Sequence, residues 1–195
     1  MKKVAVFLLL IMTISCNNRQ NCDDNIKIRE IETNNIILTL IDSTSENIFP
    51  ICTSLKKLNI RTDFNVKKKK VIIKLPPKTD LISVNSDVFI ETLLQTNYRG
   101  KAFFDKNDSL NFVEQNYCLN SKLISDELFK KIKTISLTEL KDEKSNFEYI
   151  IISNPIFSSD NKKAYIEVDT KSVGCIYGSS YFLEKQGETW KIIQI

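Results

Sequence analysis

The sequence predicts a single α+β domain in which amphipathic helices pack on an antiparallel sheet that ends in a four-strand C-terminal meander. Two observations carry this prediction. Apolar residues recur at helical spacing in segments 86–96 and 125–135, as they do on the buried face of a helix. From Phe147 onward, four runs rich in β-branched and aromatic residues are separated by short polar or glycine-containing breaks, which is typical of consecutive antiparallel strands. Helices followed by a meander indicate the α+β class.

The first 15 residues have the layout of a secretory signal peptide. Lys2 and Lys3 form a short positive segment, and an uninterrupted apolar stretch runs from Val4 to Met12. This stretch is about half of the ~20 residues that a bilayer-spanning helix needs. We therefore expect residues 1–15 to direct export and not to form a transmembrane helix.

The leader ends in Thr13, Ile14 and Ser15, and Cys16 follows it. These four residues resemble the lipobox of bacterial lipoproteins, where Leu is usual at the position of Thr13. The resemblance implies that the Cys16 thiol receives a diacylglyceryl group, that the chain is cut before Cys16, and that the new amino group is acylated. Two or more acyl chains anchor a protein stably, because each buried methylene contributes about 0.8 kcal/mol. The alternative is a cysteine that ends the apolar run by chance, before a cut elsewhere.

Residues 17–25 are polar, so we expect residues 16–25 to be a flexible tether that leads into a domain covering residues 26–195. That length fits one domain. Within it, segments 34–42 and 70–75 are short, rich in β-branched residues and flanked by polar clusters, which predicts strands.

The two predicted helices each begin at a serine. Ser86 is the expected N-cap of helix 86–96 and Ser125 that of helix 125–135, and acidic residues follow both. The only tryptophan, Trp190, lies in the last predicted strand. We expect it to be buried where that strand meets the helices.

The segments "NPIFSSDNKKAYIEVDT" and "GCIYGSSYFLEKQGETWKI" resemble the C-terminal part of uncharacterised lipoproteins of the Bacteroidota. In those proteins a "P.FS.D...A" strand, a turn with Gly and Cys, and a terminal "G.WK" strand recur. Their paired C-G-x-x-C-G turn is not matched, because Val173 and Tyr177 stand at its cysteine positions. In fold alone, the arrangement is similar to nuclear transport factor 2 and cystatin-like architectures, which implies nothing about chemistry.

The chain contains no histidine, and so lacks the commonest general base and metal ligand. It also lacks glycine-rich nucleotide motifs and H-E-x-x-H. We therefore expect no cofactor and no metal. Loss of Lys2 and Lys3 with the leader lowers the formal net charge from +4 to +2, so we also expect no nucleic acid partner. The candidate catalytic pair is Glu167 and Asp169, which share one face of a predicted strand with Tyr165. Two such carboxylates could act as general acid and base, although charges at alternate strand positions more often face solvent.

Two further groups of side chains allow a functional or a structural interpretation. The lysine run 66–71, "VKKKKV", could hold the domain against an anionic lipid or polysaccharide, or it could be a solvated loop. The aromatic residues of the meander could form a ligand wall, but at strand spacing they are more often part of the core. They are Tyr177, Tyr181, Phe182 and Trp190.

Four cysteines accompany Cys16. Because Cys22 lies in the tether, we expect at most one disulfide within the domain, formed among Cys52, Cys118 and Cys175. The alternative is that all of these cysteines are small buried thiols.

Taken together, the sequence predicts a cell-envelope lipoprotein that is exported, anchored to a membrane through lipid on Cys16, and has a non-enzymatic binding or structural role. Its envelope ligand or protein partner is not specified by any motif. The alternative function is a carboxylate-dependent hydrolase of an envelope glycan that uses Glu167 and Asp169.

Overall fold

The computed structural model describes residues 25–43, 49–62, 85–118, 124–142, 148–172 and 175–193. Outside these residues lie the predicted signal peptide, Cys16, Cys22, most of the predicted tether, the lysine run 66–71 and the predicted strand 70–75. None of the helices within the described ranges is long and apolar enough to cross a bilayer.

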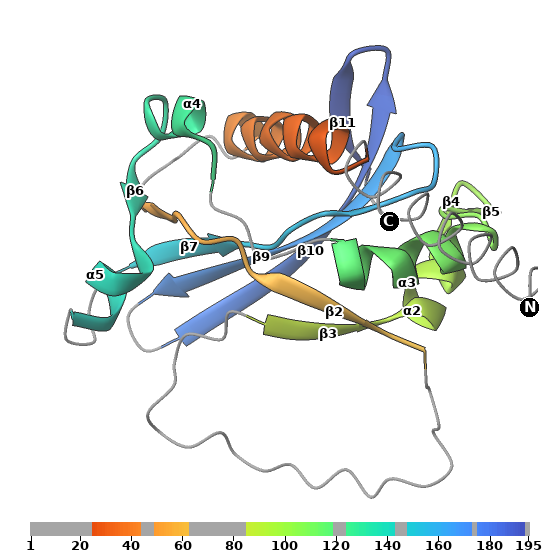
Figure 1. The fold of residues 1–195 in the computed structure, drawn as a ribbon, viewed down its shortest axis with the longest axis horizontal. Helices are drawn as coiled ribbons and strands as arrows, with labels where there is room; N and C mark the ends of the chain where they lie inside the picture. Colours follow the sequence, from red (N-terminus) through yellow and green to blue (C-terminus); the bar gives the residue numbers. More distant parts are fainter. Residues whose placement is uncertain are drawn as a thin grey trace, which may run out of the picture.

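A seven-stranded sheet forms the centre of the fold (Figure 1). Its strands are β1 (Ile51–Cys52), β6 (Thr134–Ile135), β7 (Tyr149–Ile152), β8 (Ile156–Phe157), β9 (Lys163–Ser172), β10 (Cys175–Gln186) and β11 (Thr189–Ile193). Across the sheet the order is β11-β10-β9-β7-β1-β6, and β8 also pairs with β9. The pairs among β7 to β11 are antiparallel, whereas β1 runs parallel to β6 and β7.

The α+β class and the C-terminal meander are therefore confirmed. Two details differ from the prediction. The first predicted run of the meander divides into β7 and β8, and both pair with β9. In addition, β9 and β10 extend into the segment that the sequence predicted as a break between them.

The two faces of the sheet are covered by different parts of the chain (Figure 1). Helix 25–43 covers one face, where its apolar stripe joins residues such as Ile166 and Leu183 in one buried cluster. The other face carries a second cluster, built with β2 (Lys57–Arg61), β3 (Asn85–Phe89), α2 (Ile90–Gln95) and α3 (Asp108–Cys118). The remaining elements are β4 (Asn97–Tyr98), β5 (Lys101–Ala102), α4 (Asp126–Phe129) and α5 (Leu137–Asp142).

The prediction of a strand at 34–42 is wrong, because these residues belong to helix 25–43. Ile36, Ile37, Leu40 and Ile41 are at most 8 % exposed. Residues spaced at i, i+1, i+4 and i+5 share one face of a helix, and burial of that face outweighs the strand preference of β-branched side chains.

The prediction of helix 86–96 is correct only in its second half. Residues 85–89 form β3, which pairs in parallel with β2 so that Val88 lies opposite Ile60. The helix α2 begins at Ile90, after Phe89, and Ser86 is not its cap. The pairing of β3 with β2 buries Val88, and this tertiary contact outweighs the local helix signal.

The prediction of helix 125–135 has the correct start and the wrong end. Ser125 is the N-cap of α4, and its Oγ accepts a hydrogen bond from the backbone N–H of Leu128 at 3.4 Å. The helix ends at Phe129, because Ile135 pairs in parallel with Cys52 in the main sheet. Pairing of β6 with β1 thus replaces the last helical turns.

The expected burial of Trp190 is confirmed, since this residue is 4 % exposed. Its ring lies edge-on to Phe157, with 6.1 Å between ring centroids. Its indole Nε1 donates a hydrogen bond to Oε2 of Glu32 on helix 25–43 at 2.7 Å. The last strand and the N-terminal helix are therefore joined by both apolar and polar contacts.

Two neighbouring side-chain amides of α3 join the seven-stranded sheet to the two-stranded sheet of β2 and β3. The side chain of Gln115 accepts from the backbone N–H of Phe157 at 2.9 Å and donates to its carbonyl at 2.9 Å. Asn116 makes the same pair of bonds with the backbone of Ile60, at 2.8 and 2.9 Å. Each amide supplies the donor and acceptor that a neighbouring strand would supply. Helix α3 is thereby fixed to β8 and to β2 at once.

We expect Gln115→Met to lower the free energy of unfolding by about 1–3 kcal/mol, because it leaves the backbone N–H of Phe157 buried without an acceptor. Gln115 is 1 % exposed, so water cannot replace the lost bond. Urea denaturation measures the loss. The matched control is Gln95→Met at an exposed position, which we expect to change stability by no more than about 0.5 kcal/mol. Equal stability of the two variants would show that the amide pair contributes nothing.

Candidate functional site

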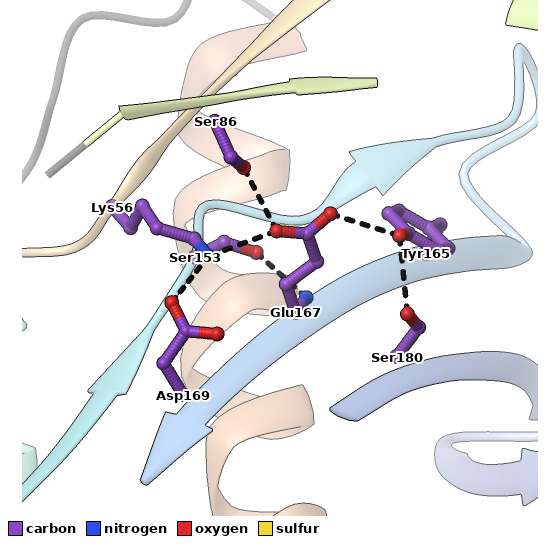
Figure 2. A network of polar contacts seen from close by, with 7 residues as sticks. All are labelled: Lys56, Ser86, Ser153, Tyr165, Glu167, Asp169 and Ser180. Carbon is purple, nitrogen blue, oxygen red and sulfur yellow. Dashed lines mark hydrogen bonds and ion pairs between the residues drawn. The ribbon is translucent and has the colours of Figure 1, made fainter. Parts of the chain in front are cut away.

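The predicted carboxylates Glu167 and Asp169 lie on the face of β9 that is covered by β2 and β3 (Figure 2). They do not face bulk solvent, so the interpretation of this strand face as a solvated surface is wrong. Their side chains are 18 % and 26 % exposed, respectively. Lys56, which was not among the predicted site residues, lies between the two carboxylates, and its side chain is only 4 % exposed.

Lys56 forms ion pairs with both carboxylates (Figure 2). Its Nζ lies 2.6 Å from Oδ2 of Asp169 and 2.9 Å from Oε2 of Glu167. Glu167 has further partners, since Oε2 accepts from Ser86 Oγ at 2.8 Å and Oε1 accepts from the Tyr165 hydroxyl at 3.0 Å. Both oxygens of Glu167 are therefore occupied, and one buried cation compensates two partly buried carboxylates.

The pKa values in this network favour the charged forms of the ion pairs. Burial alone would raise the pKa of Glu167, but hydrogen bonds from Lys56 and Ser86 outweigh it and hold the pKa below its ordinary value. Burial alone would lower the pKa of Lys56, but the hydrogen bonds to Asp169 and Glu167 raise it. Burial, together with the charge of Glu167, raises the pKa of Tyr165, which stays a neutral hydrogen-bond donor.

This arrangement is suited to holding β2 and β3 on the sheet and poorly suited to carboxylate catalysis. A glycosidase needs one carboxyl group whose raised pKa keeps it protonated as a general acid. Glu167 has the opposite shift, and a buried ammonium holds both carboxylates. Neither Glu167 nor Asp169 lines the cavity beside Arg29 or the two smaller cavities beside Lys57 and Leu40.

The aromatic residues of the meander are mostly part of the core. Trp190 is buried, and Phe182 packs edge-on against Tyr165 and Phe103. Tyr181 packs against the cluster under helix 25–43. Only Tyr177 among the four is largely exposed, so these residues do not form a common ligand wall.

The expectation of a disulfide among Cys52, Cys118 and Cys175 is wrong, because Cys52 and Cys175 are free. Cys118 is disulfide-bonded, so its partner is neither of these two. Among the three cysteines that the structure describes, the alternative of a buried thiol holds for Cys52 alone, since Cys175 is exposed at the start of β10. Burial raises the pKa of the Cys52 thiol, which keeps it protonated and unreactive.

A cavity of about 480 Å³ lies between helix 25–43 and α4, away from the carboxylates of β9. Its volume is within the range of about 300–1,000 Å³ that is typical of small-molecule sites. Charged side chains of both signs meet there with two apolar ones. Among the described residues the lining consists of Arg29, Glu30, Ile31, Thr33, Asn34, Leu55, Ser125, Asp126, Glu127 and Asn154.

Arg29 is the unusual member of this lining, because it is a cation that is only 4 % exposed. Its Nη2 donates to Oδ1 of Asn111 at 2.7 Å, and its Nε donates to Oδ1 of Asn161 at 3.1 Å. No carboxylate of the described residues forms an ion pair with it. Burial lowers the pKa of the guanidinium, and the more distant charge of Glu114 opposes this effect.

Asn154 is the second unusual member, since it is 7 % exposed. Its backbone N–H donates to the carbonyl of Lys56, but its side-chain amide forms no hydrogen bond with any described residue. Within the described ranges, the one side-chain polar atom that is sealed from solvent without a partner belongs to Glu91. The amide of Asn154 is therefore not sealed, and it borders the open space of the cavity.

Periodicity in the sequence marks Lys56 and Arg29, although neither was among the predicted site residues. Lys56 alternates with Leu58 and Ile60, which are buried, so strand periodicity places it on the inner face. Arg29 lies on the same helical stripe as Ile36 and Ile37, but this is visible only once residues 34–42 are assigned to a helix. Asn154 is not marked by any pattern in the sequence.

No protein-family model, curated protein or solved structure matches the chain. The site is therefore interpreted from its own residues alone.

Proposed function

We propose that the protein is a cell-envelope lipoprotein whose exported domain has a non-enzymatic binding role and is held to a membrane by lipid on Cys16. The observation that carries the proposal is the stretch Thr13, Ile14, Ser15 and Cys16 at the end of a short apolar leader with lysines before it. That combination supports lipidation at Cys16 more strongly than any other motif of the chain supports another function.

The described part of the chain supports binding more than catalysis. The cavity beside Arg29 has the volume of a small-molecule site, and the described residues do not use all of its polar groups. The carboxylates of the alternative function, Glu167 and Asp169, are instead held by Lys56. For this reason we do not propose a glycan hydrolase. Turnover of an envelope glycan that is abolished in a folded Glu167→Gln variant would contradict the non-enzymatic role.

We expect Cys16→Ala to abolish incorporation of a radiolabelled or clickable fatty acid, because the alanine side chain offers no thiol for the diacylglyceryl group. The precursor should remain uncut before residue 16, and the domain should be released or mislocalised. Gel fluorography after metabolic labelling measures the first effect, and cell fractionation measures the last. Cys22→Ala is the matched control and should keep the label. Label retained by the Cys16→Ala protein would contradict the proposed anchor.

A further inference from the structure

We propose that the cavity between helix 25–43 and α4 binds a small zwitterion of the amino-acid class, whose carboxylate contacts Arg29 and Asn154 and whose ammonium group contacts Asp126 and Glu127. This inference rests on the proposed binding role and specifies its ligand. It is carried by the charges and the available hydrogen-bonding groups of these four side chains, which line one cavity.

Arg29 is the first element of the argument. A buried charge is normally compensated by a counter-ion, because transfer of an unpaired ion out of water is costly. Arg29 is 4 % exposed and forms hydrogen bonds only to the neutral amides of Asn111 and Asn161 among the described residues. These two bonds fix the guanidinium and leave its Nη1 without a described acceptor. A ligand carboxylate would supply the missing negative charge.

Asn154 supplies a second donor at the same cavity. Its amide forms no hydrogen bond within the described part of the chain, although the residue is more than nine-tenths buried. The amide borders the open space of the cavity, so its hydrogen-bonding groups are available to a ligand there. A ligand carboxylate can accept a hydrogen bond from Asn154 Nδ2. Guanidinium and amide donors together form a common carboxylate-binding combination.

The acidic side of the cavity determines what else the ligand carries. Asp126 and Glu127 are exposed residues of α4 that line the same space as Arg29. A simple anion would be repelled by these carboxylates, and a simple cation would be repelled by Arg29. A ligand with both charges satisfies both sides. Ile31 and Leu55 add apolar surface, which favours an amino acid with an aliphatic side chain.

Isothermal titration calorimetry with the detergent-solubilised full chain tests the inference. The probes are L-leucine, the dipeptide leucyl-leucine, N-acetyl-leucine, which lacks the ammonium group, and leucinamide, which lacks the carboxylate. We expect L-leucine or the dipeptide to bind with a Kd below about 1 mM. The better of these two distinguishes a free amino acid from a short peptide. Each blocked analogue should bind at least about tenfold more weakly, because one charged contact is lost.

Variants assign the contacts. Asn154→Ala should weaken binding of the better probe by about tenfold. The Tm should not fall, since the amide has no described hydrogen-bond partner to lose. Arg29→Gln should abolish binding. The Tm of this variant shows whether it still folds without the hydrogen bonds from Arg29 to Asn111 and Asn161. The double variant Asp126→Asn, Glu127→Gln should weaken binding of the zwitterion but not that of N-acetyl-leucine. Glu188→Gln, whose side chain is 97 % exposed, is the control and should bind as the wild type does.

Three results would overturn the inference. The first is the absence of binding of every probe at about 10 mM. The second is binding that Asn154→Ala leaves unchanged. The third is N-acetyl-leucine or leucinamide that binds as tightly as the zwitterion. Each of them leaves the fatty-acid labelling of Cys16 unaffected, so the failure of this inference is distinguishable from the failure of the proposed anchor.

Discussion

Lys56→Met should lower the free energy of unfolding by about 3–5 kcal/mol, because it leaves two partly buried carboxylates without their common buried cation. The Nζ atom of Lys56 lies within 2.9 Å of oxygens of both Glu167 and Asp169. Methionine fills a similar volume, so the loss reports mainly on the charge. Urea denaturation at neutral pH is the measurement.

Arg61→Met is the matched control, since it removes a cation from the adjoining strand β2. The pair of Arg61 with Asp87 has side chains that are 58 % and 47 % exposed, and such surface pairs contribute at most about 1 kcal/mol. A Lys56→Met variant that is as stable as the control would show that the network does not hold β2 on the sheet. The triple variant with Glu167→Gln and Asp169→Asn should recover part of the loss, because no buried charge remains.

The pH dependence of the same variant has a defined sign. The pKa of Glu167 is lowered from 4.5, so its contribution to stability is present above pH 4.5 and is lost as pH falls through the folded pKa. The pKa of Lys56 is raised from 10.5, so its contribution is lost only as pH rises through that higher value. The difference between wild type and Lys56→Met should therefore be largest in the neutral range and shrink below pH 4.5. A difference that grows on acidification would contradict this account.

Trp190→Ala should also lower the free energy of unfolding by about 3–5 kcal/mol, as expected for truncation of a large buried aromatic side chain. The substitution removes the contact with Phe157 and the hydrogen bond to Glu32. Glu32 keeps Lys185, whose Nζ lies 2.7 Å from Oε1. The loss should therefore arise mainly from the apolar cavity and not from an uncompensated carboxylate.

Thermal and urea denaturation measure the effect of Trp190→Ala. Tyr177→Ala is the matched control in the adjacent strand, because Tyr177 is 61 % exposed and its truncation should change stability by about 0.5 kcal/mol or less. Trp190→Phe should lose less than Trp190→Ala, since it keeps an aromatic ring against Phe157. Unchanged stability of Trp190→Ala would show that β11 does not close the core.

The elements that the sequence predicted correctly are those whose local pattern agrees with their tertiary contacts. The C-terminal meander has short breaks between its β-rich runs, and it pairs with its own sequence neighbours. The errors occur where partners lie far apart in the chain. Segment 85–89 is a strand because it pairs with β2, and Ile135 leaves the predicted helix because it pairs with Cys52. A pattern in a short segment of sequence does not show a pairing with a strand so far away in the chain.

The same reason explains the outcome at the candidate sites. Alternation correctly placed Glu167, Asp169 and Tyr165 on one face of a strand, but it could not show which element covers that face. The covering residues, Lys56 and Ser86, precede Glu167 by more than 80 positions. The cavity beside Arg29 was missed because the segment that forms its helix was interpreted as a strand.

The adjacent amides of α3 also affect how the protein avoids self-association. An open strand edge presents backbone donors and acceptors that can recruit a strand from another molecule. Gln115 occupies those groups at Phe157, and Asn116 occupies them at Ile60. One helix therefore shields two edges from aggregation. If α3 detaches, both strand edges are uncovered in the same event. A partly unfolded molecule then exposes two edges that can pair with a strand of another molecule.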